Sequence, residues 1–178
     1  MPNHVINEVI FRNVNAEQQG RILSLVQNDE GRIDFELLVP APKNIWWGNT
    51  SSKHTNAFRI SHLDWARENW GTKWNAYGMD EDGNYKSVVP AENSLTLTFQ
   101  TAWGPPYGWL VALFNTLKIS FEHNWFSEGE SRGHHAIFDQ PAMQEGIGDP
   151  WREVTADDDM QRHLHKLLWG VEKFEDED

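Results

Sequence analysis

The stretch LTLTFQTAWGPPYGWLVALFNTLKISFEHNW, residues 95–125, decides the fold of this chain. Apolar and polar side chains alternate at its start and again over residues 119–125, and this period of two predicts a half-buried strand at each end. Between the strands, Pro105 and Pro106 suit the first turn of a helix, and the apolar residues that follow recur at helical spacing. The stretch is therefore a β-α-β unit.

The N-terminal part of the chain repeats this pattern. Residues 4–11 are rich in Val, Ile and Phe and predict a strand, and Asn15 then begins a helix with Gln18 as its capping-box partner. Residues 33–39 alternate apolar and polar side chains and predict a second strand, which Pro40 ends. The first unit is therefore also β-α-β.

Two split β-α-β units in one chain are typical of a ferredoxin-like α+β sandwich, in which both crossover helices cover one face of the sheet. We expect a single domain over residues 1–178. Its antiparallel sheet should have the spatial order 4-1-3-2, with the four strands near residues 4–11, 33–39, 94–101 and 118–126. A further hairpin strand is predicted at residues 134–138.

Residues 43–93 form a Trp-rich insertion between the two units. Its first part shows no clear period and is predicted to be loop, up to a short helix that Ser61 caps. The run Asp-Glu-Asp-Gly at residues 80–83 is typical of a turn. It predicts a hairpin between residues 73–77 and 85–89.

The C-terminal stretch, residues 149–178, is the most acidic part of the chain. It holds ten Asp or Glu against four Lys or Arg, which is half of the net charge of −12. Thr155 with Asp158 is typical of a helix start, and a helix is predicted over residues 157–171 as an addition to the sandwich, followed by a mobile tail. The apolar stripe of this helix consists of Met160, Leu164, Leu167, Leu168 and Val171.

A family resemblance is carried by four segments, which are PNHVIN at 2–7, DF at 34–35 leading to VPAP at 39–42, NWGTKWNA at 69–76 and TAWGPP at 101–106. With these segments, residues 2–140 resemble the YubB-like family of phage and plasmid proteins. The resemblance implies a ferredoxin-like domain and an origin on a mobile genetic element. It implies no catalytic residue, and the acidic stretch from Asp149 has no counterpart in it.

The composition of the chain argues against several classes of function. With 27 Asp and Glu against 15 Lys and Arg, the chain repels phosphates, which argues against direct nucleic-acid binding and against an anionic membrane surface. The absence of Cys excludes disulfides and thiolate metal sites. No signal peptide is found, so we expect a cytoplasmic protein. No hydrolase, phosphate-loop or dinucleotide motif occurs, so neither a cofactor nor a catalytic residue is predicted.

The eight His residues do not predict a metal site. His134 and His135 would point to opposite faces of a strand. His163 and His165 would lie about 200° apart around a helix, unlike the paired ligands of a zinc-binding helix. His123 is expected on the inward face of its strand, buried and neutral.

Four residues of the Trp-rich segments are candidates for binding: Trp70, Lys73, Trp74 and Trp103. Tryptophan beside a cation is typical of the residues that dominate protein interfaces. The competing structural interpretation, which we prefer here, is that Trp70 and Trp74 are largely buried and attach the insertion to the sheet, while Lys73 is solvated.

The acidic stretch supplies three further candidates, Asp157, Asp158 and Asp159, which either contact a basic partner or place negative charge at a helix N-terminus. We predict a non-enzymatic accessory protein of a phage or plasmid that binds the basic surface of a host or defence protein. Two alternatives stay open. One is a small-molecule or nucleotide-processing enzyme with a cleft near the Trp-rich motifs, and the other is a structural or oligomeric module.

Overall fold

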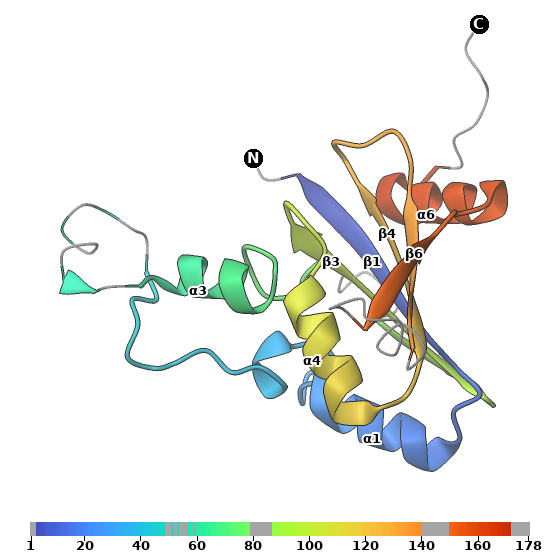
Figure 1. Cartoon of the computed structure of the whole chain (residues 1–178), viewed down its shortest axis with the longest axis horizontal. Helices are drawn as coiled ribbons and strands as arrows, with labels where there is room; N and C mark the ends of the chain where they lie inside the picture. The colour runs from blue at the N-terminus through green and yellow to red at the C-terminus, as the bar shows by residue number, and fades with distance from the viewer. Residues whose placement is uncertain are drawn as a thin grey trace, which may run out of the picture.

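The computed structural model describes residues 3–48, 51, 53, 57, 58, 60–78, 87–139 and 150–171. These form a six-stranded antiparallel sheet in the spatial order β2-β3-β1-β4-β5-β6, with helices packed on it (Figure 1). The strands are β1 (His4–Arg12), β2 (Val88–Ala91), β3 (Ser94–Ala102), β4 (Phe121–Ser127), β5 (His134–Phe138) and β6 (Trp151–Val154). The helices are α1 (Ala16–Val26), the short 3-10 helix η1 (Phe35–Leu37), α3 (His62–Asn69), α4 (Tyr107–Leu117) and α6 (Asp158–Trp169).

β1 is the central strand of the ferredoxin-like arrangement, and it pairs with β3 on one side and β4 on the other. In the β1–β3 ladder, His4 lies opposite Ala102 and Arg12 lies opposite Ser94. The chain returns from β3 through α4 to β4 on the far side of β1. The order β4-β1-β3 therefore confirms three of the four predicted strand positions.

Residues 33–39 are not a strand, so that prediction is wrong. They form η1 and the turns around it, because the Asp34 carboxylate accepts a hydrogen bond from the Glu36 N–H (2.9 Å) and bends the chain locally. Phe35 is fully buried in this turn. Apolar and polar side chains therefore alternate along the segment although its backbone is not extended. The sheet position beside β3 is taken instead by β2, which a two-residue turn joins to β3.

The insertion also departs from the predicted hairpin. The Tyr77 N–H donates to the Gln100 carbonyl oxygen (3.0 Å), and the Gln100 N–H donates to the Tyr77 carbonyl oxygen (2.7 Å). Residues 73–77 therefore lie along the part of the β3 edge that β2 leaves open, and Val88 and Val89, in the described part of the predicted second arm, pair with β3 instead. The predicted turn at 80–83 lies outside the described residues.

The two faces of the sheet carry different helices. Val5 and Val9 of β1 pack in one cluster with the apolar sides of α1 and α4, so both crossover helices share one face, as predicted. Ile6 points to the opposite face, where it packs with Phe126 and with Leu164 of α6. Figure 1 shows α1 and α4 together, away from α6.

The predicted helix starts are largely confirmed. Capping boxes begin α1 at Asn15 and α3 at Ser61. The last helix begins after Asp157 and not at Thr155, because the Asp157 carboxylate accepts a hydrogen bond from the Met160 N–H (2.9 Å). The expected mobile tail lies outside the described residues.

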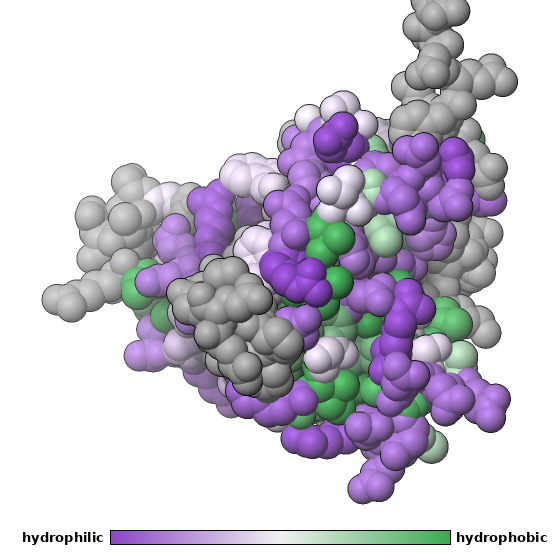
Figure 2. Space-filling model, turned by 45° about the vertical axis from the view of Figure 1, so that its right-hand side comes forward, coloured by the Kyte–Doolittle hydropathy of each residue, from purple (hydrophilic) through white to green (hydrophobic). Residues whose placement is uncertain are grey.

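The surface agrees with the low hydrophobic content of the chain. The face shown in Figure 2 is mostly hydrophilic, with hydrophobic side chains gathered low in the view. None of the described helices is long and apolar enough to span a membrane. Against this polar background, the exposed tryptophans of the described part of the chain are Trp47, Trp74, Trp103 and Trp169.

Candidate functional site

The two Trp-rich segments pack directly against each other, where the end of α3 meets the start of α4. The Trp109 N–H donates to the Trp70 carbonyl oxygen (3.3 Å). A Cβ at position 108 would collide with the Asn69 carbonyl oxygen, so this close approach requires Gly108. Gly71, with φ of +87°, ends α3 in the left-handed region that favours glycine.

Trp70 belongs to the core, which confirms the prediction that it is buried. Its side chain is inaccessible to solvent, and its Nε1–H donates to the Val39 carbonyl oxygen (2.9 Å). Its ring lies edge-on to the rings of Phe35 and Trp65. Trp70 therefore attaches the insertion to the sandwich and is not available to a partner.

Trp74 is exposed, so the prediction that it is buried is wrong. Its side chain is 41% exposed, because residues 73–77 lie along the edge of β3 instead of over the face of the sheet. The ring meets the Tyr77 ring edge-on, with centroids 6.1 Å apart. The Lys73 ammonium group lies 4.7 Å from the Trp74 ring centroid.

Trp103 follows β3 in an unusual backbone conformation. Its φ of +75° is in the left-handed region, which is rare for a bulky residue, and its N–H donates to the Asn3 carbonyl oxygen (2.9 Å). Its side chain is 55% exposed. The Lys73 ammonium lies 4.6 Å from the Trp103 ring centroid, and the Arg67 guanidinium carbon lies 4.9 Å from it. We call Arg67, Lys73, Trp74 and Trp103 the tryptophan–cation surface.

The two cations of this surface have no carboxylate partner in the part of the chain that the structure describes. Within the described residues, neither Arg67 nor Lys73 forms an ion pair, whereas Arg12 pairs with Glu122 (2.5 Å). Each cation–π contact contributes roughly 0.5–1 kcal/mol at an exposed site and holds a long side chain in one arrangement. The described residues therefore leave N–H groups of both cations available to an external acceptor.

Arg67 and Tyr77 complete this region, and no local sequence pattern signals either of them. Arg67 reaches Trp103 only because α3 lies beside the end of β3. The Tyr77 hydroxyl donates to the Thr101 carbonyl oxygen (3.0 Å). Burial and the nearby Glu128 carboxylate raise the pKa of Tyr77 to about 12, so its hydroxyl stays protonated.

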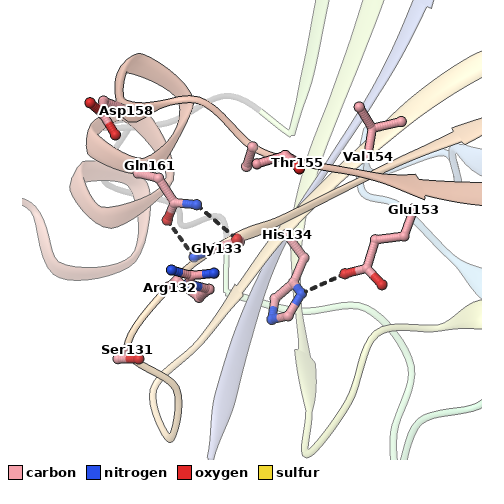
Figure 3. A pocket seen from close by; sticks show the side chains of 10 residues that line it. Ser131, Arg132, Gly133, His134, Glu153, Val154, Thr155, Asp158 and Gln161 are labelled. Carbon is pink, nitrogen blue, oxygen red and sulfur yellow. Dashed lines mark hydrogen bonds and ion pairs between the residues drawn. The ribbon is translucent and has the colours of Figure 1, made fainter.

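An open groove of about 760 Å³ lies between the start of β5, the end of β6 and the start of α6 (Figure 3). In it, His134 has its Nδ1 atom 2.9 Å from Glu153 and its Nε2 atom 2.8 Å from Glu130. Gln161 forms hydrogen bonds with both the N–H and the carbonyl oxygen of Gly133, and it thereby links α6 to the residue that precedes β5. The groove is lined by Ser131, Arg132, Gly133, His134, Glu153, Val154, Thr155, Ala156, Asp158 and Gln161. It therefore does not include the tryptophans near which a cleft is predicted.

The three candidate aspartates lie at the start of α6, on the other side of the molecule from α3 (Figure 1). Asp157 caps the helix, and Asp159 pairs with Arg162. Asp158 lines the groove. The structure thus separates these aspartates from the tryptophan–cation surface.

A partly buried polar network joins α6 to the sheet. The Glu8 carboxylate accepts hydrogen bonds from His163 Nε2 (2.8 Å) and Asn124 Nδ2 (3.0 Å). Asn124 in turn accepts a hydrogen bond from His135 Nδ1 (2.6 Å). Burial alone would raise the pKa of Glu8, but the hydrogen bonds and the positive charge of His163 outweigh it and lower this pKa. The hydrogen bond to Glu8 raises the pKa of His163.

The predicted opposite orientations of His134 and His135 and the predicted burial of His123 are confirmed. His134 stacks on the Trp125 ring (centroids 4.7 Å apart) on one face of the sheet, whereas His135 bonds to Asn124 on the other face. His123 is fully buried. Burial, assisted by the charge of His135, lowers the pKa of His123 to about 3, so its ring is neutral.

Residues 70–166 match the family model described as "Ferredoxin-like domain in Api92-like protein", over more than half of the chain. The chain belongs to this family. The matched segment begins at Trp70 and contains Lys73, Trp74 and Trp103. It also includes β6 and most of α6, so the match extends over the helix that is added to the sandwich. No curated protein and no solved structure matches the chain.

Proposed function

We propose that this Api92-like chain is a non-enzymatic binding protein that attaches to another protein through the tryptophan–cation surface. The environment of Trp103 carries this proposal: its ring is more than half exposed, its backbone is left-handed, and two cations lie over the ring. The resemblance to the YubB-like family supports an origin on a phage or plasmid. A host or defence protein is therefore the partner we propose.

The backbone of Trp103 makes this exposed position costly. A left-handed conformation costs an L-residue about 1–2 kcal/mol, whereas glycine adopts it without steric cost. Residues held in such conformations cluster at functional sites. Trp and Arg are also the residue types most enriched among those that dominate interface free energies. A contact between the Trp103 ring and a partner accounts for tryptophan at this position.

A second contact with the partner is proposed at the acidic groove beside α6. Asp158 and Glu153 both line the groove beside α6, and the net charge of −12 would accelerate encounter with a basic partner. Association through this surface would slow as salt screens the charges. A variant with Asp158→Asn and Glu153→Gln should then associate more slowly at low salt, and an unchanged association rate would contradict this contact.

The groove gives less support to an enzyme. A catalytic His must exchange a proton with its substrate through a ring nitrogen. Both ring nitrogens of His134 already bond to carboxylates of the chain, those of Glu153 and Glu130. His134 is therefore better explained as a structural residue that links Glu153 of β6 to Glu130 of the loop before β5.

Two tryptophan variants test the binding proposal. Trp103→Ala removes the central ring, and Trp169→Ala is the matched control, because Trp169 is 48% exposed but lies on α6. We expect the wild type and Trp169→Ala to retain a host protein from a lysate and Trp103→Ala to lose it, while all three keep the same circular dichroism spectrum. Equal retention by all three, or retention by none, would contradict the proposal.

A further inference from the structure

Resting on the function proposed above, we infer that the tryptophan–cation surface takes an acidic segment of its partner, in which Asp or Glu residues stand next to an apolar side chain. The surface combines two positive groups with two exposed indole rings. Carboxylates complement the first pair and an apolar side chain complements the second.

Arg67 and Lys73 supply the positive charge. A guanidinium group carries five N–H donors in a planar fork, and an ammonium group carries three. Contacts with a ring face leave most of these donors free, and bonds between guanidinium and carboxylate groups are among the strongest hydrogen bonds in proteins. Because both cations already lie within 5 Å of the Trp103 centroid (4.9 Å and 4.6 Å), binding would cost little side-chain entropy.

Trp74 and Trp103 supply the apolar contact. Their ring centroids lie 4.7 Å and 4.6 Å from the same Lys73 ammonium group, so both rings contact one positive charge. An apolar side chain next to a carboxylate that binds Lys73 therefore has an exposed indole ring within reach. Each Å² of apolar surface covered there would contribute about 25 cal/mol.

Other macromolecules fit this surface less well. A basic segment would be repelled by Arg67 and Lys73. Single-stranded nucleic acid also stacks its bases on tryptophan, but its phosphates continue along the strand, beyond the two cations, and meet a chain of net charge −12. An acidic protein segment, in contrast, needs carboxylates only at the positions that contact Arg67 and Lys73, and it can be uncharged elsewhere.

Synthetic peptides test this chemistry. The probe is acetyl-Glu-Phe-Asp-Glu-Leu-amide, its control is acetyl-Gln-Phe-Asn-Gln-Leu-amide, and an oligothymidylate tests for nucleic acid. Binding is followed by nuclear magnetic resonance of the indole N–H groups, so that each tryptophan reports separately. We expect only the acidic peptide to shift the signals of Trp74 and Trp103, without shifting that of Trp169, and its affinity to fall as salt increases.

Charge-removing variants complete the test. Arg67→Gln and Lys73→Gln should each weaken binding of the acidic peptide about tenfold, as expected for the loss of a hydrogen bond to a charged group. Arg132→Gln is the matched control, because Arg132 is exposed but lines the groove, and it should bind as the wild type does. Equal binding of the amide peptide, tighter binding of oligothymidylate, or unshifted Trp74 and Trp103 signals would overturn the inference.

The two proposals fail in different ways. If the acidic peptide does not bind but Trp103→Ala still loses its host protein, the inferred partner chemistry is wrong and the binding function stands. If Trp103→Ala keeps its host protein, the proposed function is wrong, and an acidic peptide bound at Trp103 would then be unrelated to it.

Discussion

The Nε2 atom of His163 on α6 lies 2.8 Å from the Oε1 atom of Glu8 on β1. This pair lies next to the apolar contact between α6 and the sheet, in which Leu164 packs on Ile6. Glu8 is only 7% exposed, and a buried carboxylate needs a hydrogen-bonded partner of opposite charge. We therefore expect the attachment of α6 to the sheet to depend on pH.

We expect His163→Gln to remove this pH dependence. The raised pKa of His163 contributes stability that is fully present below its unfolded pKa of about 6.5 and is lost as pH rises through the folded pKa. The lowered pKa of Glu8 contributes stability that is present above its unfolded pKa of about 4.3 and is lost as pH falls through the folded pKa. The difference in Tm between wild type and variant should therefore be largest between about pH 4.3 and 6.5. A difference that is constant with pH would contradict this assignment.

His123 should make the fold sensitive to acid. Its pKa is about 3 in the folded chain, so below an unfolded pKa of about 6.5 only the unfolded chain gains the proton and stability falls. His123→Gln keeps a donor for Asn7 Oδ1, which lies 3.1 Å from the imidazole Nε2. Between about pH 6.5 and 4, urea unfolding should show a smaller loss of stability for the variant than for the wild type. Parallel losses in both proteins would exclude His123 as the cause.

Trp70→Ala should destabilise the protein by roughly 3–5 kcal/mol, as for other large core aromatics. The substitution leaves a cavity beside Phe35 and removes the donor to the Val39 carbonyl oxygen. Chemical denaturation measures the loss, with Trp169→Ala as the exposed control. A variant that keeps the wild-type unfolding midpoint would show that Trp70 is not a core residue.

Trp103→Gly should leave stability within about 1 kcal/mol of the wild type. Relief of the left-handed backbone, about 1–2 kcal/mol, offsets the lost cation–π contacts and the added freedom of the unfolded chain. The same variant should lose the host protein, because the ring is gone. The checks are thermal unfolding and capture from a lysate, and a large fall in Tm would assign Trp103 a structural role.

A substitution at Gly108 tests the contact between α3 and α4, and the same substitution at Gly20 is its control. Gly108→Ala should destabilise by roughly 1–3 kcal/mol, because its Cβ would collide with the Asn69 carbonyl oxygen. Gly20→Ala lies in α1 with open space around it and should stabilise by about 0.4–1 kcal/mol. Opposite signs in thermal unfolding are the expected result, and equal effects would show that the α3–α4 contact is loose.

Short-range patterns were sufficient for most elements of the sandwich. Alternation and helical spacing within residues 94–117 predict β3 and α4, and Asn15 and Ser61 cap their helices through bonds to residues three positions later. Such features depend on neighbours along the chain. Residues 33–39 show the limit, because a strand and a turn that buries Phe35 give the same alternation.

The sequence by itself determined the ferredoxin-like order of β4, β1 and β3, the side of the sheet that both crossover helices cover, and the burial of Trp70. These follow from local periodicity and from the handedness of β-α-β connections. Only the tertiary structure decided that Arg67, Lys73, Trp74 and Trp103 meet at the surface. Their contact joins α3, the open edge of β3 and the turn before α4, and the exposure of each ring depends on which distant segments pack over it.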